Sequence, residues 1–200
     1  MDSRKIFEIY KLINDRSIKP VSAWPSIADI PIGATVLDSD VVIKRCGDVS
    51  GSIWQTRTRA ADNNWRALTE CTLGAWAGRL VAVAYSGTGN CVMTSDDGGI
   101  TWQTRTSAAD NDWRALTECT SGAWAGRLVA VAYTGTGNRV MTSDDGGTTW
   151  KTRTSAADNN WRALTECTLG AWAGRLVAVS EYGTGNRVMT SDLKKELRKI

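Results

Sequence analysis

The segment RLVAVAYTGTGNRVMTSDDGGTTW, residues 127–150, alternates short β-forming runs with glycine-rich turns. Residues 127–133 are apolar and β-branched and have the length of one strand. The glycines of GTGN, residues 135–138, suit a tight hairpin turn, because glycine adopts the positive φ that such turns require. Another strand follows, and the turn SDDGG (143–147) leads into a further strand at residues 148–154. The segment therefore predicts antiparallel β-structure.

This pattern recurs with a period of 48 residues. Residues 55–102 and 103–150 differ at six positions, and residues 151–192 differ from the second copy at six positions as well. Each copy contains a further strand before these, at residues 112–120 in the second copy. Four short strands and three turns in each period are typical of one β-propeller blade. Glycine and β-branched residues fall where helix interiors would lie, so the pattern disfavours a helical array.

Composition excludes several classes of function. The 200-residue chain carries 24 Lys and Arg against 21 Asp and Glu, a net charge of +3. That balance is too weak to indicate a nucleic acid or an anionic membrane as partner, and no apolar run is long enough to span a bilayer. The sequence has no His, which excludes His-based catalytic triads, general bases and metal ligands. We therefore expect no cofactor and no metal site.

Five cysteines are present, and three of them, Cys71, Cys119 and Cys167, occupy one position of the repeat. An odd number without a tight spacing makes a poor disulfide framework, and no CxxC pair is available for zinc. We expect the three repeated thiols to fill small buried slots. The first residues lack the apolar stretch of a signal peptide, so the sequence predicts a reducing, cytoplasmic location.

SDDGGITW (95–102) and SDDGGTTW (143–150) resemble the Asp-box, or BNR repeat, of the form S-x-D-x-G-x-T-W. The phrases GTGNRVMTSDDG and TSAADNNWRAL are similar to repeats of uncharacterised phage, viral and bacterial proteins. The resemblance covers residues 47–192 and implies a β-propeller, the fold of sialidases and photosystem assembly factors, with a virion as an alternative location. In that family the box lies at the outer turn between the third and fourth strands, away from the central pocket. The residues that match the box are Ser95, Asp97, Gly99, Thr101 and Trp102, then Ser143, Asp145, Gly147, Thr149 and Trp150.

The chemistry of the box explains these residues without a ligand. The Asp side chain can accept backbone N–H bonds across the turn, and glycine adopts a φ that other residues resist. The Trp can fold back over the turn as an apolar plug. SDDGG lacks the spaced oxygen ligands and the closing Glu of an EF-hand loop. We therefore expect a structural role for the box residues and no metal.

Three blades do not close a propeller, which typically has four to eight. GDVSGSIW (47–54) is a degraded box that keeps a glycine and Trp54, and it opens a strand at residues 53–58. In the third copy, Leu-Lys-Lys at 193–195 interrupts the box, so that copy lacks a fourth strand. The N-terminal strand is then the missing piece of the C-terminal blade. Exchange of this strand between two chains predicts a six-bladed homodimer.

Two flanking segments fall outside the repeats. Residues 1–46 predict a helix at about 4–15, followed by an irregular stretch and by one or two strands in 36–45. This segment either packs against the propeller or a partner chain, or docks another protein. Residues 193–200 are a basic tail, for which the sequence predicts a short helix or a frayed end. We favour a solvated end over a contact with a membrane or a nucleic acid.

A sialidase-like enzyme would need an arginine cluster, a Tyr/Glu nucleophile pair and an Asp acid on different blades. Here each blade carries nearly the same residues, including Arg66, Arg114 and Arg162. Glu181 beside Tyr182 breaks the symmetry, but neighbours along a strand point to opposite faces. The sequence therefore predicts a sialidase-like fold without the sialidase site, and a chain that is not an enzyme.

We rank a noncatalytic interaction or structural propeller first, a multivalent lectin second and a glycosidase third. A lectin would use an aromatic platform with polar neighbours, repeated on each blade to raise avidity. The candidate residues for glycan binding are Trp65 with Asn63, Trp113 with Asn111, and Trp161 with Asn159. A second tryptophan set is Trp76, Trp124 and Trp172. In the alternative interpretation, both sets fill the space between blades.

Overall fold

The structure, a computed structural model, describes residues 35–38, 41–44, 54–183 and 185–192. The chain divides into two compact units, residues 1–56 and 57–200. In the first unit, β1 (Thr35–Asp38) and β2 (Val41–Lys44) pair as an antiparallel hairpin. The hairpin begins one residue before the stretch 36–45, for which the sequence predicts one or two strands. The expected helix at residues 4–15, the start of the degraded box and the basic tail lie outside the described residues.

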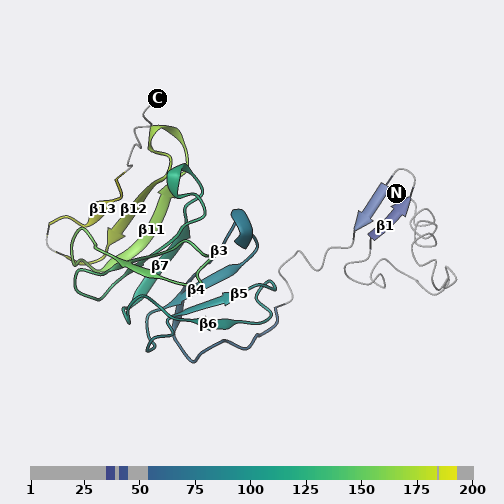
Figure 1. The fold of residues 1–200 in the computed structure, drawn as a ribbon, viewed down its shortest axis with the longest axis horizontal. Helices are drawn as coiled ribbons and strands as arrows, with labels where there is room; N and C mark the ends of the chain where they lie inside the picture. Colours follow the sequence, from purple (N-terminus) through teal and green to yellow (C-terminus); the bar gives the residue numbers. More distant parts are fainter. Residues whose placement is uncertain (1–34, 39–40, 45–53, 184, 193–200) are drawn as a thin grey trace. The chain divides into compact units, whose positions relative to one another are not determined.

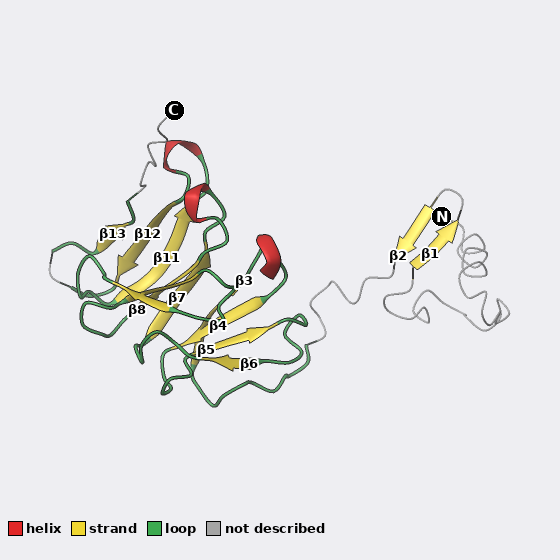
Figure 2. Ribbon diagram, in the orientation of Figure 1, coloured by secondary structure: helices red, strands yellow, loops and turns green. Residues whose placement is uncertain are grey.

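Three antiparallel sheets form the described part of the second unit (Figures 1 and 2). The first sheet contains β3 (Trp65–Glu70), β4 (Leu80–Ala84), β5 (Val92–Ser95) and β6 (Gln103–Arg105). The second contains β7 (Trp113–Glu118), β8 (Leu128–Ala132), β9 (Val140–Ser143) and β10 (Lys151–Arg153). The third contains β11 (Trp161–Cys167), β12 (Arg175–Ser180) and β13 (Val188–Thr190). Within each sheet, neighbouring strands follow one another in the sequence.

The expectation of all-β structure with four-stranded antiparallel sheets is confirmed in the first two copies. Among the described residues the third sheet has three strands, as the interrupted box predicts. Residues 54–58, for which the sequence predicts a strand, belong to no strand in this single chain. The prediction pairs them with the third sheet of a second chain, so it stays a prediction.

Local sequence explains the strands and turns. The LVAVA runs of β4 and β8 are almost wholly buried, as an apolar β-branched strand between two packed faces should be. Gly135 and Gly137 of the hairpin turn both have positive φ, as expected from GTGN. Between the first two strands of each sheet lies a short 3-10 turn that the sequence did not predict: η3 (Gly74–Trp76), η4 (Gly122–Trp124) and η5 (Gly170–Trp172). No helix among the described residues is long and apolar enough to cross a membrane.

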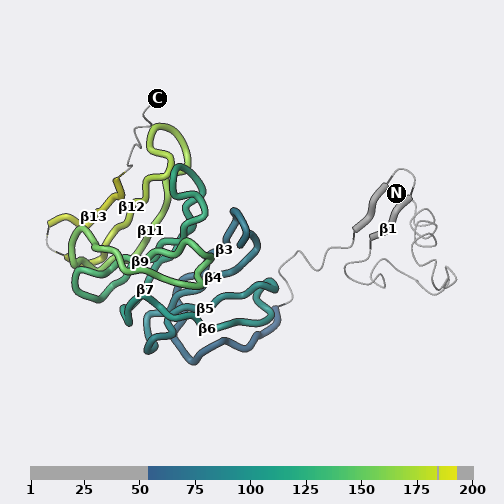
Figure 3. The backbone as a smooth tube through the Cα atoms, in the orientation of Figure 1, coloured from purple at the N-terminus to yellow at the C-terminus, as the bar shows by residue number. Residues whose placement is uncertain are grey.

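The sheets pack face to face in sequence order, with β3 against β7 and β7 against β11 (Figure 3). The core between the first and second sheets includes Val81, Val83 and Val92 on one side and Leu128 and Met141 on the other. A smaller core, formed by Val131, Trp161 and Ala178, joins the second sheet to the third. The faces between successive sheets are therefore the apolar interior of this unit.

Candidate functional site

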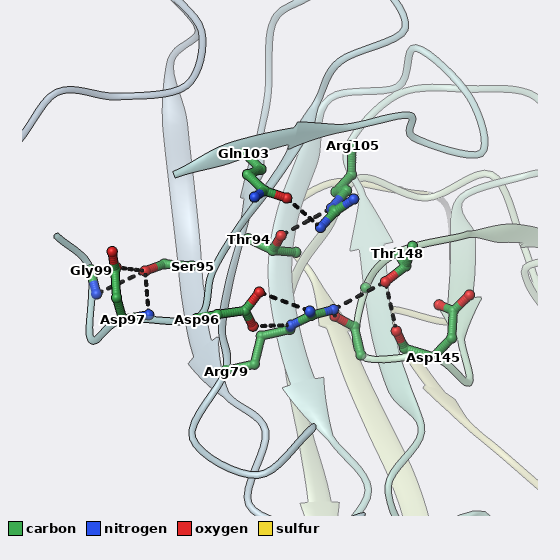
Figure 4. A network of polar contacts seen from close by, with 12 residues as sticks. Arg79, Thr94, Ser95, Asp96, Asp97, Gly99, Gln103, Arg105, Asp145 and Thr148 are labelled. Carbon is green, nitrogen blue, oxygen red and sulfur yellow. Dashed lines mark hydrogen bonds and ion pairs between the residues drawn. The ribbon is translucent and has the colours of Figure 1, made fainter. Parts of the chain in front are cut away.

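The SDDGG turns are held by hydrogen bonds within each turn (Figure 4). Asp97 accepts bonds from the Ser95 hydroxyl at 2.8 Å, the Thr101 amide at 2.9 Å and the Thr101 hydroxyl at 2.6 Å. The Gly99 amide donates to Ser95 Oγ at 2.9 Å, and Trp102 Nε1 donates to the Gly99 carbonyl at 3.0 Å. The side chains of Ser95, Asp97, Thr101 and Trp102 thus make hydrogen bonds inside the turn.

The second turn repeats this geometry. Asp145 accepts from the Ser143 hydroxyl and from the amide and hydroxyl of Thr149, at 2.6–2.8 Å. The Gly147 amide donates to Ser143 Oγ, and Trp150 Nε1 donates to the Gly147 carbonyl. Trp150 is buried in the core between the first and second sheets. The second turn therefore plugs the space between two sheets.

The same bonds shift the acidity of both carboxyl groups. The hydroxyl and amide of Thr101, with the Ser95 hydroxyl, lower the pKa of Asp97 to about 2. Burial by itself would raise the pKa of Asp145, but the bonds from Thr149 and Ser143 outweigh it and lower that pKa. Both groups are therefore stable as carboxylates that accept hydrogen bonds.

A tryptophan, an arginine and an aspartate form a unit beside each complete turn. The Arg79 guanidinium lies 4.0 Å from the Trp76 ring centroid and makes two bonds to Asp96, at 2.6 and 2.9 Å. Its hydrogen bond to Arg79 lowers the pKa of Asp96. Arg79 also donates to the Gly146 carbonyl and, at 3.0 Å, to the Thr148 hydroxyl (Figure 4). This unit of the first sheet therefore holds the turn of the second.

A glutamate provides another contact between sheets. Glu118 accepts from the Thr72 amide at 2.7 Å, from the Thr72 hydroxyl and from the Leu73 amide at 3.3 Å. Glu166 in the third sheet binds Thr120 and Ser121 of the second in the same way, at 2.6–3.0 Å. Burial would raise the pKa of Glu166, but these bonds outweigh it and lower the pKa. Each carboxylate thus bonds to the loop of the preceding sheet.

The tryptophans predicted to bind glycans lie in the interior. Trp113 and Trp161 are 0% exposed, and their indole N–H groups donate to the Ala109 and Ala157 carbonyls at 3.0 and 3.1 Å. Trp65, at the open first sheet, is partly buried and donates to Ala61. No indole face of Trp113 or Trp161 is open to a sugar ring, a position that agrees with the alternative of space filling.

The asparagines predicted beside them brace the GTGN turns. The Asn111 amide donates to the Asn138 carbonyl at 2.9 Å and to the Asn138 side chain at 3.1 Å. The equivalent residues Asn63 and Asn159 donate to the carbonyls of Asn90 and Asn186. Each bond spans 27 residues of sequence, so it ties the start of a sheet to a later turn in the same sheet.

Repeated arginines alternate with tyrosines across the sheets. Arg66 and Arg114 lie 5.8 and 4.7 Å from the ring centroid of Tyr85. Arg114 and Arg162 lie 5.1 and 5.7 Å from that of Tyr133. Cation–π contact of this kind is attractive. The repeated arginines therefore lie beside tyrosines of the protein itself.

Glu181 stands in the third copy where the others have tyrosine. Its carboxylate lies 3.1 Å from Arg162 Nε, so an ion pair ends the series of arginines and tyrosines. Glu181 and Tyr182 follow β12 and do not belong to it, because that strand ends at Ser180. The sequence predicted Glu181 and Tyr182 on opposite faces of one strand. That placement is wrong, because neither residue belongs to a strand.

Hollows lie between the described sheets. A groove of about 420 Å³ runs between the 3-10 turns of the first two sheets and is lined by Trp76, Trp124, Arg127 and Asp144 among others. A more apolar cavity of about 290 Å³ lies between the second and third sheets. Sequence reasoning missed this cavity, although the interrupted box after Asp192 was a signal for it.

No family model and no curated protein matches the chain. Among solved structures, the leech intramolecular trans-sialidase complexed with 2,7-anhydro-Neu5Ac is 20% identical, with a TM-score of 0.49, and the match covers 62% of this chain and 20% of that one. Ycf48 bound to a D1 peptide is 17% identical, with a TM-score of 0.48, and its match covers 83% of this chain and 48% of that one. The chain thus spans less than half the length of either protein.

Proposed function

We propose that the chain is a noncatalytic interaction module of the propeller type, which binds a protein surface through the open ends of its series of sheets. The observation that carries the proposal is a difference in exposure between residues of identical repeat position. Val83 and Val131 are buried between sheets, whereas the equivalent Val179 of the third sheet is 44% exposed. Val188 beside it on β13 is 58% exposed. Apolar surface of this kind is typical of an interaction site.

The first sheet is open in a similar way. Leu68 is 58% exposed, whereas the equivalent Leu116 and Leu164 pack against the preceding sheet. Burying apolar surface contributes about 25 cal/mol per Å². Both ends therefore favour contact with another surface.

The polar groups offer little for catalysis. The repeated arginines stack on tyrosine or tryptophan, and the turn carboxylates accept hydrogen bonds from their own turns. A catalytic carboxylate or arginine has to be available to its substrate. This arrangement supports a module that binds and does not turn over a substrate.

Fluorogenic glycosides, including a sialoside, test the noncatalytic part of the proposal. We expect no turnover by the unaltered chain or by the variant Glu181→Gln, which removes the carboxylate that stands where the other two copies have tyrosine. Turnover by the unaltered chain that disappears in Glu181→Gln would show a glycosidase and contradict the proposal.

Carbohydrate binding is a second candidate, and the groove between the 3-10 turns favours it. Trp76 and Trp124 are partly exposed there, beside the polar groups of Arg127 and Asp144. Sugar rings stack on such aromatic faces and bond to polar neighbours. A glycan array with the unaltered chain and Trp124→Ala tests this function. A signal that Trp124→Ala abolishes supports it, and an array without signals rejects it.

A further inference from the structure

We infer that the partner of the open ends is a second copy of this chain, joined head to tail so that each copy supplies what the other's last sheet lacks. The inference rests on the proposed function and names its partner. Three contacts that recur inside the chain, two between sheets and one between strands of a sheet, are each incomplete at its two ends. For each contact, the group that is missing at one end of the chain is present at the other end.

The glutamate contact is the first of these. Glu118 binds the Thr72 loop of the preceding sheet, and Glu166 binds the Thr120 loop. One period earlier stands Glu70, which is exposed and has no hydrogen-bond partner among the described side chains. One period later stands Thr168, exposed and followed by Leu169 at 85% exposure. Glu70 of one copy therefore matches the Thr168 loop of another.

The cavity between the second and third sheets is the next incomplete contact. Between the first and second sheets, a Cβ at Gly147 would lie 2.9 Å from Val81 and 3.5 Å from Leu128, so the turn is in close contact with both. The residues one period later, Val129 and Leu176, line the cavity between the second and third sheets. The cavity therefore lies where a third turn and its tryptophan would be.

Trp54 is the tryptophan available to fill it. The interrupted third copy has Arg198 at the position that corresponds to Trp102 and Trp150. Trp54 corresponds to the same position one period before the first copy, and it is 87% exposed. A tryptophan in a cavity lined by valine, leucine and methionine would remove a large apolar side chain from water.

The edge of the third sheet, at β13, is the third incomplete contact. Trp102 is followed by QTR, which forms β6, and Trp150 by KTR, which forms β10. Trp54 is followed by QTR as well, yet residues 55–57 belong to no strand. In the third sheet β13 pairs with β12 alone among the described strands. Residues 55–57 of a second copy fit beside β13 as its fourth strand.

Two copies are sufficient to satisfy both ends. Each copy offers Trp54 of its first unit and, independently, Leu68 and Glu70 of its second unit. These three residues, the N-terminal set, meet the C-terminal set of the other copy (Thr168, Leu169, Val179 and Val188). The two contacts are identical and related by a two-fold axis, which closes a ring of six sheets. Six lies within the four to eight blades at which propellers close.

A pair of complementary variants tests the head-to-tail arrangement. Variant N carries Trp54→Ala and Glu70→Gln, and variant C carries Val179→Glu and Val188→Glu. All four side chains are exposed, so each variant should fold, which circular dichroism and thermal melting can verify. We expect sedimentation velocity to give a dimer for the unaltered chain and at least a tenfold higher dissociation constant for each variant alone. An equimolar mixture should form a heterodimer, because the C-terminal set of N and the N-terminal set of C remain intact.

Two variants at one repeat position, Glu118→Gln and Glu70→Gln, separate the contact between copies from the stability of a single chain. Glu118→Gln weakens a contact inside the chain and should lower the melting temperature of dilute protein. Glu70→Gln alters the same repeat position at the end and should leave that temperature unchanged, while it weakens the dimer. Equal effects of the two on melting would overturn the role of Glu70.

Other outcomes of the sedimentation experiment would overturn parts of the inference. A mixture of N and C that stays monomeric while the unaltered chain dimerises would overturn the head-to-tail arrangement. An unaltered chain that is monomeric at all concentrations would overturn the second copy as partner but leave the proposed function. Failure of that function would appear separately, as glycoside turnover that Glu181→Gln abolishes.

Discussion

Asp97 shows how one side chain can organise a turn without a ligand. Its carboxylate accepts three bonds from Ser95 and Thr101, although it lies at the surface. The spacing S-x-D-x-G-x-T-W was sufficient to predict such bonds, because all the partners lie within four residues of the aspartate. Local motifs of this kind can be predicted from sequence for this reason.

Acid should weaken the fold through Asp97. Its pKa of about 2 lies below the ordinary value of 3.8, so the folded state prefers the carboxylate. The resulting stabilisation is present above about pH 4 and is lost as the pH falls through 2. We expect the unfolding free energy of the unaltered chain to fall more steeply between pH 4 and 2 than that of Asp97→Asn. Urea titrations at several pH values measure the free energy of unfolding. The same pH dependence for both proteins would contradict a stabilising role of the Asp97 carboxylate.

Gly147 and Gly99 allow a matched test of the contact between sheets. Both have positive φ, +81° and +87°, so alanine strains the backbone equally at both. A Cβ at Gly147 would lie 2.9 Å from Val81, whereas at Gly99 the nearest atom would be at 3.5 Å. We expect Gly147→Ala to lower the free energy of unfolding by about 1–3 kcal/mol more than Gly99→Ala does, because only the former overpacks the contact. Equal losses in urea denaturation would show that the second turn does not press on the first sheet.

At the level of elements, the repeat places identical strands in different surroundings. Residues 139–144 and 187–192 both read RVMTSD. β9 pairs with β8 and β10, whereas β13 pairs with β12 alone among the described strands. The strands themselves could be predicted, because β-forming runs and glycine turns are local. The 3-10 turns could not, because three residues such as Gly-Ala-Trp give no periodic signal.

Hydrogen exchange should separate these two identical segments. Their intrinsic exchange rates are the same, so any difference reports pairing. In dilute protein we expect the amides of β13 to exchange about tenfold faster or more than those of β9, since an edge strand opens locally at low cost. Peptides that extend to residue 145 or 193 distinguish the two by mass. Equal protection in dilute protein would mean that β13 is already covered within one chain.

For the whole molecule, sequence predicted a series of sheets and a gap at its end, but not which residues face the gap. Glu118 reaches a loop 46 residues earlier, and nothing local in the sequence marks that partner. Trp113 was a candidate for sugar binding because it has polar neighbours, yet it is core. Identical copies carry identical signals, so only the structure separates a buried copy from an exposed one.

Cysteine labelling tests whether a second copy covers the last sheet. Cys71 and Cys119 are buried, and burial raises the pKa of both thiols to about 11, which keeps them unreactive at neutral pH. Cys167, at the same position of the last copy, is only partly buried. In dilute protein we expect iodoacetamide to modify Cys167 before Cys71 and Cys119. Modification of Cys167 should become slower as the concentration rises and a second copy covers it. Peptide mass spectrometry follows each thiol, and a rate at Cys167 that does not depend on concentration would contradict this coverage.

If the contacts between sheets continue from one copy of the chain to a second, the protein in solution is a dimer. Absolute mass by light scattering on a size-exclusion column tests this claim. We expect a mass of roughly twice 21.7 kDa for the unaltered chain, and a shift toward the single-chain mass for Trp54→Ala at the same concentration. A stable particle of 21.7 kDa at every concentration would contradict the claim.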